Sequence, residues 1–229
     1  MIAEHRFYGT TLPQGWNTSS NGLALLTMEQ AVADLAVFRD KFQRQVLAPL
    51  GQSENAWITV GCGYSGALAA WAHTKHPQHF AGAWASSPPL LPSVEFPQHD
   101  MHDLNAIGEQ CASKLRTISD MIEMEFSNIG PDGPFRLKAL FHAPEKMALS
   151  DFRYMLADSI SLAVQHGYRR LLCDALTSSS NDDDLVFVFA NITQSLWGAS
   201  FAGSCHFHTD CLSSVEHKLT AARSWHWQV

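Results

Sequence analysis

One short segment restricts the possible folds of this chain more than any other. Residues 57–60 (WITV) form a β-rich run that ends at a glycine, as a buried strand does. A tight turn follows at residues 61–66 (GCGYSG), then an alanine-rich helical stretch at 67–76, then a second apolar run at 80–85. A strand, a helix and a strand in this order make a βαβ unit, so the segment predicts a parallel sheet and an α/β fold.

The helix predicted before this unit has a recognisable start and end. Thr27 and Gln30 have the spacing of a capping box, in which the threonine side chain accepts a hydrogen bond from a backbone N–H of the first turn. Apolar residues then recur at helical spacing from Met28 to Val46, and the pattern stops before Pro49. We therefore expect an amphipathic helix here.

The character of the chain changes after residue 97. Apolar residues follow helical spacing across 104–122 and again across 185–196, and no second βαβ series is visible. We predict that residues 1–97 form a partial α/β core, residues 98–223 a mostly helical cap inserted into it, and residues 224–229 the start of a return to the core.

Charge and composition exclude several classes of protein. The formal net charge is −7, whereas nucleic-acid binding needs a basic face to hold phosphates. No run of about 18 apolar residues is present, so we expect no membrane-spanning segment, and the first residues lack a signal-peptide pattern. Hydrophobic residues make up 46% of the chain and charged residues 16%, which is enough to bury a core. We predict neither a metal nor a cofactor.

The glycine-rich turn has the form in which α/β hydrolases hold a nucleophile. Such a turn exposes the nucleophile between strand and helix, and the next backbone N–H at the helix N-terminus stabilises an oxyanion. Two registers fit: the nucleophile position is Gly63 if residues 61–65 form the pattern, and Ser65 if residues 63–67 do. The predicted strand end favours Gly63, because a nucleophile comes shortly after the strand and before the helix. Ser65 is the alternative nucleophile, and an ordinary helix-start serine is its other interpretation.

Three stretches of the chain resemble the prolyl carboxypeptidase and dipeptidyl peptidase II family of serine peptidases. Residues 4–9 (EHRFYG) are similar to that family's Glu-His-Arg-aromatic-Tyr-Gly block, residues 30–38 to its following helix, and residues 60–71 with 82–89 to its nucleophile region. The resemblance implies an α/β hydrolase with a helical cap that needs no cofactor and cleaves a peptide on the carboxyl side of proline, near one end. It also implies a possible homodimer and a lysosomal, vesicular or secreted location.

The chain departs from the resembled family at the turn and in length. The family pattern is Gly-x-Ser-Tyr-x-Gly, which puts Gly63 where the serine nucleophile belongs and Tyr64 where a backbone N–H faces the oxyanion. The triad's aspartate and histidine lie near the family's C-terminus, which implies positions beyond Val229. These departures imply a fragment or degenerate member that is inactive as it stands. The alternatives are a non-catalytic binding relative and an esterase that uses Ser65.

Five cysteines raise questions of pairing, metal binding and reactivity. An odd number leaves one cysteine unpaired or paired elsewhere. We expect Cys111, in a full-length relative, to pair with a cysteine outside this chain or near its C-terminal end. Residues 205–211 (CHFHTDC) contain several metal-ligand types but lack a second, distant ligand pair. We interpret them as a loop with half of a disulfide or ordinary polar groups. We interpret Cys62, which precedes Gly63, as a packing residue.

Overall fold

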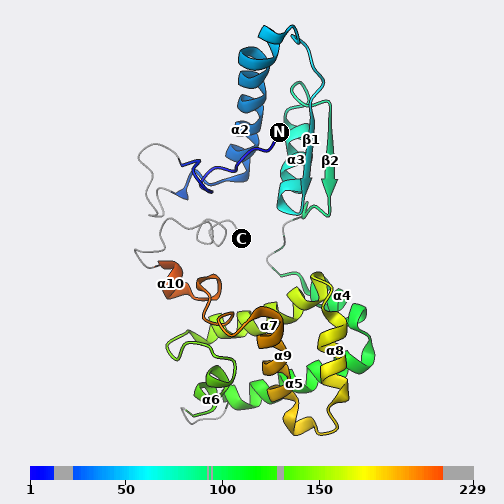
Figure 1. Cartoon of the computed structure of the whole chain (residues 1–229), viewed down its shortest axis with the longest axis vertical. Helices are drawn as coiled ribbons and strands as arrows, with labels where there is room; N and C mark the ends of the chain where they lie inside the picture. The colour runs from blue at the N-terminus through cyan, green and yellow to red at the C-terminus, as the bar shows by residue number, and fades with distance from the viewer. Residues whose placement is uncertain (13–22, 92, 94, 128–131, 214–229) are drawn as a thin grey trace. The chain divides into compact units, whose positions relative to one another are not determined.

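The structure is a computed structural model of residues 1–229, and it describes residues 1–12, 23–91, 93, 95–127 and 132–213. The described residues fall into two compact units, one within Met1–Val94 and the other within Glu95–Ser214 (Figure 1). The predicted boundary at residue 97 lies close to this division. The predicted end of the cap at residue 223 and the return segment 224–229 lie outside the described residues.

The first unit contains the helix that the capping box predicts. Helix α2 spans Met28–Phe42, and the Thr27 hydroxyl oxygen accepts a hydrogen bond from the Gln30 N–H at 3.2 Å. The helical path continues as a π-helix and a 3-10 helix, η1 (Gln43–Leu47) and η2 (Ala48–Leu50). The predicted N-terminal cap of this helix, at Thr27, is confirmed. The path extends slightly beyond its predicted end because Pro49 occupies the first turn of η2, where a missing N–H costs no hydrogen bond.

A two-stranded parallel sheet follows, as the βαβ pattern predicts. Strands β1 (Ile58–Cys62) and β2 (Gly82–Ser86) pair in parallel, from Ile58 with Gly82 to Cys62 with Ser86. Helix α3 (Tyr64–Lys75) connects them. The partial α/β fold is therefore confirmed. Strand β1 continues past the predicted end at residue 60, and α3 begins before the predicted start at residue 67, so a single residue separates them.

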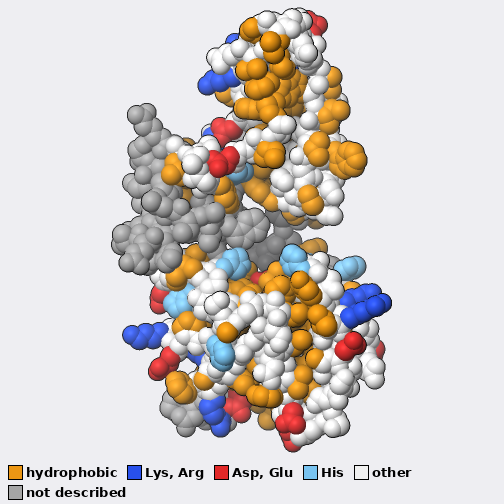
Figure 2. All heavy atoms as spheres, in the orientation of Figure 1, with side chains coloured by type: hydrophobic (Ala, Val, Ile, Leu, Met, Phe, Trp, Pro, Cys, Tyr) orange, Lys and Arg blue, Asp and Glu red, His pale blue; other side chains and the backbone are white. Residues whose placement is uncertain are grey.

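The two faces of this sheet differ. On one face the Thr59 hydroxyl donates a hydrogen bond to the Ala69 carbonyl oxygen of α3 at 3.0 Å. On the other face Ile58 is 65% exposed and Val60 72% exposed, and Trp84 of β2 is 70% exposed. Figure 2 shows hydrophobic side chains exposed on this unit. In most proteins, helices cover both faces of a parallel sheet. The face with Ile58, Val60 and Trp84 is apolar and exposed, unlike the usual arrangement.

The second unit consists of helices throughout its described residues. The α-helices are α4 (Pro97–Ile107), α5 (Glu109–Ser127), α6 (Asp132–Leu140), α7 (Leu149–Gln165), α8 (Arg169–Ser178), α9 (Leu185–Trp197) and α10 (Thr209–Ser213). Two 3-10 turns, η3 (Asp182–Asp184) and η4 (Cys205–Phe207), join them. The helical cap is confirmed. Across the described parts of both units, no helix combines the length and apolarity that crossing a membrane requires.

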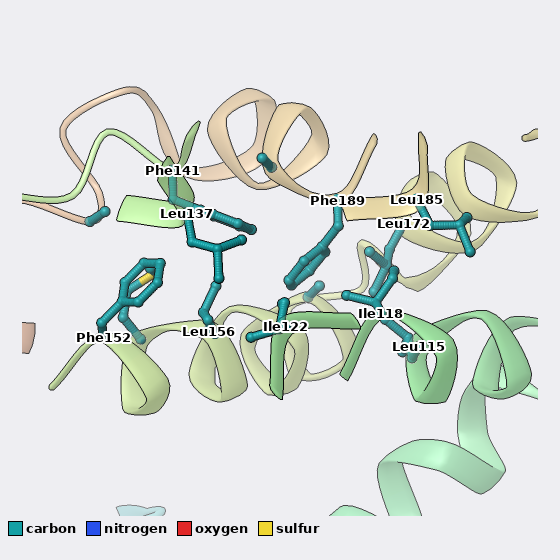
Figure 3. Close-up of a cluster of buried hydrophobic side chains, with 14 of the residues drawn as sticks. Leu115, Ile118, Ile122, Leu137, Phe141, Phe152, Leu156, Leu172, Leu185 and Phe189 are labelled. Carbon is teal, nitrogen blue, oxygen red and sulfur yellow. The ribbon is translucent and has the colours of Figure 1, made fainter. Parts of the chain in front are cut away.

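One hydrophobic core holds the helical unit together. Side chains from α5, α7, α8 and α9 meet in it (Figure 3). Phe141 makes edge contacts with Phe152 and Phe189, at ring-centroid distances of 5.8 and 5.6 Å. Edge-to-face packing of this kind adds about 1 kcal/mol per pair to the hydrophobic burial. The core explains why a region without strands forms a compact unit of its own.

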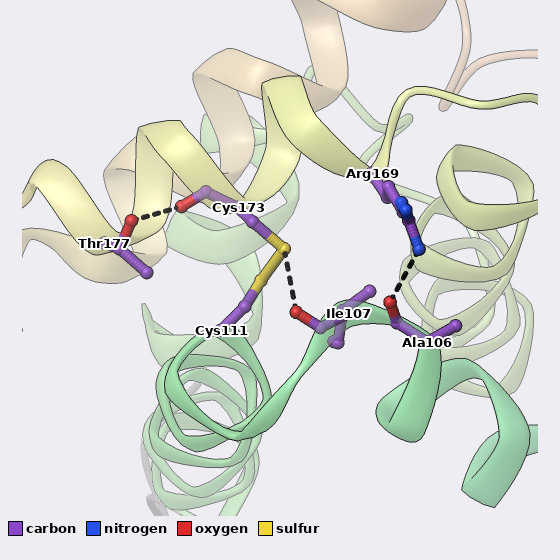
Figure 4. The surroundings of a disulfide bond; sticks show 6 residues. All are labelled: Ala106, Ile107, Cys111, Arg169, Cys173 and Thr177. Atoms are coloured by element: carbon purple, nitrogen blue, oxygen red, sulfur yellow. Dashed lines mark hydrogen bonds between the residues drawn. A yellow bond between two sulfur atoms is a disulfide. The ribbon is translucent and has the colours of Figure 1, made fainter.

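A disulfide inside this unit corrects our expectation for Cys111. Cys111 at the start of α5 is bonded to Cys173 of α8, with a Cα–Cα distance of 5.3 Å (Figure 4). Close to it, Arg169 donates a hydrogen bond to the Ala106 carbonyl oxygen near the end of α4, at 3.0 Å. Cys111 therefore pairs within the cap, and the unpaired cysteine among the five is Cys62. The expectation was wrong because the odd count does not say which cysteine is left over.

Loss of this disulfide is expected to destabilise the helical unit more than loss of the other one. Cys111–Cys173 closes a loop with a sequence separation of 62, whereas Cys205–Cys211 closes one of 6. The chain-entropy relation gives about 4 kcal/mol for the first and about 2 kcal/mol for the second. Urea unfolding of the two double Cys→Ser variants measures this difference. Equal losses would show that loop length does not govern the contribution.

Candidate functional site

The turn between β1 and α3 has one residue with an unusual backbone. Gly63 has φ +58° and ψ −129°, and it directly precedes the first residue of α3. Its N–H donates to the Ser86 carbonyl oxygen at 2.9 Å, and its carbonyl oxygen accepts from the Ala67 N–H at 3.0 Å. Residues other than glycine rarely adopt this backbone conformation. A sharp strand-to-helix turn whose central residue has a positive φ is the geometry in which α/β hydrolases expose a nucleophile, and glycine adopts this φ without strain.

Two glycines flank this residue for steric reasons. A Cβ atom on Gly61 would lie 2.1 Å from the Ser65 carbonyl oxygen, and one on Gly66 would lie 3.0 Å from the carbonyl oxygens of Gly61 and Ser86. At Gly61 the strand and the helix approach too closely for a side chain, and at Gly66 a Cβ atom would be in tight contact with two backbone carbonyl oxygens. At Gly63, by contrast, a Cβ atom would meet nothing within 4 Å. The turn therefore has space for a side chain at Gly63, none at Gly61 and little at Gly66.

Ser65, the alternative nucleophile, uses its hydroxyl to close the turn. The Ser65 Oγ donates to the Cys62 carbonyl oxygen at 2.8 Å and accepts from the Cys62 N–H at 3.1 Å. Both bonds join the first turn of α3 to the end of β1. In this position the Ser65 hydroxyl bonds back to the residue three positions earlier, while the residue before α3 is Gly63, which has no side chain to cap the helix.

Cys62 does not pack as expected. Its thiol is free and exposed, because Cys62 lies on the same sheet face as the exposed Ile58 and Val60. The interpretation of Cys62 as a packing residue is therefore wrong, because its side chain is exposed in the described part of the chain. The prediction failed because the sheet face on which Cys62 lies is exposed in the described residues.

Tyr64, the candidate oxyanion residue, is the first residue of α3 and is tied to the N-terminal segment. His5 Nδ1 lies 2.8 Å from the Arg6 carbonyl oxygen, and His5 Nε2 lies 3.1 Å from the Tyr64 hydroxyl. A carbonyl oxygen only accepts, so Nδ1 carries the proton, and in the neutral ring Nε2 accepts from the tyrosine hydroxyl. His5 thus connects the start of the chain to the first residue after the turn.

Hydrogen bonds also hold the other polar side chains of residues 4–6 in place. The Arg6 guanidinium makes two bonds of 2.6 Å to the Asp34 carboxylate of α2 and one of 2.7 Å to the Leu25 carbonyl oxygen. The Glu4 carboxylate accepts hydrogen bonds from the backbone N–H groups of Thr10 and Thr11. The sequence did not assign these roles. The one sequence feature that could have indicated these contacts is the charged and aromatic run of residues 4–9 (EHRFYG), which we used only as evidence of a family resemblance.

The His5 contact predicts a pH dependence of stability in the first unit. Burial lowers the pKa of His5 below its ordinary value of 6.5. The unfolded chain then binds a proton at a higher pH than the folded one, so stability is fully present above about pH 6.5 and declines as the pH falls below it. The protection of the α3 amides against hydrogen exchange, measured relative to the intrinsic exchange rate at each pH, should therefore decrease between pH 7.5 and 5.5. His5→Gln should reduce this loss of protection.

A matched control for this pH effect is available in the other unit. His102 is exposed on α4, so His102→Gln should leave the exchange of the α3 amides unchanged at either pH. An unaltered pH profile in the His5→Gln variant would contradict the assignment of the effect to His5.

The CHFHTDC run forms a small disulfide loop. Cys205 and Cys211 are bonded to each other, which removes both thiols as metal ligands. His208 Nδ1 accepts a hydrogen bond from the Cys211 N–H at 3.1 Å. In the part of the chain that the structure describes, no group of three or more histidine, cysteine or acidic side chains has the arrangement of a metal site.

A glycine-flanked turn between a parallel strand and a helix, with a central residue of positive φ, is typical of an α/β hydrolase. Comparison with known proteins gives the particular family. The family model described as serine carboxypeptidase S28 matches residues 1–229, and the chain belongs to this family. The recognition made from the sequence motifs is therefore confirmed.

Individual relatives show how much of such a protein the chain represents. A protein of Arabidopsis thaliana named probable serine protease EDA2 is 31% identical over 204 residues, which is 85% of this chain and 41% of the relative. Lysosomal Pro-X carboxypeptidase of Homo sapiens is 32% identical over 163 residues, which is 68% of this chain and 32% of the relative. The Pongo abelii protein of the same name is 33% identical over the same share of each chain. The chain thus spans well under half the length of these curated relatives.

Proposed function

We propose that this chain is a peptidase relative that keeps the nucleophile turn of its family without the nucleophile, and that it does not hydrolyse peptides by itself. The observation that carries the proposal is the geometry of Gly63, which combines a positive φ with open space for a Cβ atom. On either side of it stand Gly61, whose close contacts leave no room for a side chain, and Gly66, whose contacts leave little. Position 63 is therefore where a nucleophile would be exposed, and glycine has no group that could attack a carbonyl.

The parent reaction of such a site is acyl transfer from a peptide. By resemblance, and by the name of the Pro-X carboxypeptidase relatives, the bond would lie on the carboxyl side of proline near one end of the peptide. A serine hydroxyl would attack the carbonyl, a histidine would take its proton, and an aspartate would orient the histidine. The Tyr64 backbone N–H at the start of α3 would stabilise the oxyanion.

Without a nucleophile, the N-terminus of α3 at the turn is better suited to binding a peptide than to hydrolysing one. A helix N-terminus carries a partial positive charge, which attracts a carbonyl oxygen or a carboxylate of a peptide whether or not a nucleophile is present. In the esterase alternative, the Ser65 hydroxyl would first have to break both of its bonds to Cys62. We therefore propose that Ser65 has a structural role. Of the two alternatives, we favour a non-catalytic binding relative over an esterase that uses Ser65.

A turnover assay tests the proposal. Purified protein is expected to release no fluorophore from a proline-linked fluorogenic peptide above the rate in buffer, because no side chain at position 63 can form an acyl intermediate. Ser65→Ala should give the same result, with circular dichroism confirming that the variant is folded. Measurable turnover that disappears in Ser65→Ala would contradict the proposal and establish Ser65 as the nucleophile.

A further inference from the structure

The helical unit contains a cavity of about 360 Å³ that the proposed function does not use. It lies between α4, α5 and α7, and Phe189 of α9 contributes to its floor. The floor is apolar: Ile118, Ile122 and Leu156 belong to the buried cluster that Figure 3 shows together with Phe189. Small-molecule sites in proteins have this character, with a mostly apolar wall and a few placed polar groups.

Among the charged residues that line the cavity, Asp103 on α4 is the most buried. Asp103 is only 8% exposed. Its Oδ2 accepts a hydrogen bond from the Ser161 hydroxyl at 2.8 Å and lies 3.7 Å from His99 Nδ1. A buried carboxylate is costly unless a cation or several donors satisfy it. Ser161 supplies one neutral donor, and the His99 imidazole, which forms an ion pair only when protonated, lies at 3.7 Å, beyond hydrogen-bond distance. The Asp103 end of the cavity is therefore suited to a further donor that carries positive charge.

The other charged residues that line the cavity do not change this preference. Arg153 is paired with Glu123 at 2.9 Å and lies 4.6 Å above the Phe126 ring. Arg116 is paired at 2.7 Å with Glu109, which is not among the lining residues. Both guanidinium groups therefore already have a carboxylate partner. Asp100, close to Asp103 on α4, adds a further negative charge to the lining.

We propose that this cavity binds a small apolar ammonium compound. Its alkyl or aryl part would lie on the floor formed by Ile118, Ile122 and Phe189, and its ammonium group would donate hydrogen bonds to Asp103. Apolar burial supplies most of the affinity, and the charged hydrogen bond to a desolvated carboxylate supplies the selectivity. The proposal concerns residues of the helical unit alone and does not depend on the peptidase assignment.

Calorimetric titration of the whole chain with three eight-carbon compounds tests the proposal. Octylammonium is expected to bind about tenfold more tightly than neutral octanol, since a hydrogen bond to a charged group contributes about 1.5 kcal/mol or more. Octanoate should bind more weakly than octanol, because its carboxylate would meet Asp103. If octylammonium does not bind, or binds no better than octanoate, the proposal is wrong.

Three variants assign the binding to this cavity. Asp103→Asn should lower the affinity for octylammonium to that for octanol and leave octanol binding unchanged. Asp120→Asn removes the same charge from an exposed position of α5 outside the lining and should change neither affinity. Ala157→Trp, at an exposed lining position, should fill the cavity and abolish binding of both compounds. If Asp103→Asn does not fold, Ala157→Trp decides: unchanged binding in that variant would overturn the proposal.

Discussion

Gly61→Ala is expected to lower the free energy of unfolding of the first unit by about 3 kcal/mol, at the upper end of what overpacking costs. The added methyl group would lie 2.1 Å from the Ser65 carbonyl oxygen and 2.2 Å from its carbonyl carbon. These are backbone atoms at the start of α3, so no side-chain rotation relieves the clash. Either the helix moves away from the strand or the parallel ladder breaks at Gly61 and Ala85. Hydrogen exchange of the α3 amides measures the loss separately from the helical unit.

Gly82→Ala is the matched control for this effect. Gly82 also lies on a strand of the parallel sheet, but a Cβ atom there would meet nothing within 4 Å. The substitution should be neutral or should stabilise the unit by about 0.5 kcal/mol, because alanine restricts the unfolded chain more than glycine does. Equal effects of the two substitutions would show that the close approach at Gly61 is not what requires glycine.

The sequence predicted the strand, turn and helix well because these elements are specified locally. The apolar run, the glycines and the alanine-rich stretch follow one another directly, and the parallel pairing follows from their order. The predicted boundaries were less accurate. Gly61 and Cys62 look like the beginning of a turn, yet pairing with Ala85 and Ser86 keeps both residues in the sheet. Tertiary pairing outweighed local preference at those positions.

Three features that the sequence did not predict depend on packing between distant segments. The Cys111–Cys173 bond requires α5 and α8 to lie together, and helical periodicity does not say which helices are neighbours. The hydrogen bond from Tyr64 to His5 joins residues 59 positions apart. The cavity at Asp103 arises only where three helices meet. Amphipathic patterns predict that a helix has a buried face, but not what that face packs against.

Gly63→Ser is expected to be tolerated and to create a serine nucleophile only when its catalytic partners are present. The backbone at residue 63, with φ +58°, would strain a serine by about 1–2 kcal/mol, while its Cβ atom meets no neighbour within 4 Å. A serine hydroxyl is a weak nucleophile at its own pKa and needs an adjacent imidazole to take its proton. We propose, from the family resemblance, that this imidazole and its carboxylate partner lie beyond residue 229.

Fluorophosphonate labelling, with mass spectrometry to locate the label, tests whether residue 63 is the nucleophile position. Four proteins are compared: the 229-residue chain, and a chimera that joins it to the remaining segments of a curated relative, each with glycine or serine at position 63. We expect labelling only in the chimera with Gly63→Ser, and on residue 63. Labelling of Ser65 in any of the four would contradict the assignment of the nucleophile position. Strong labelling of the 229-residue chain with Gly63→Ser would show that a histidine within residues 1–229 supplies the base, against the placement we propose.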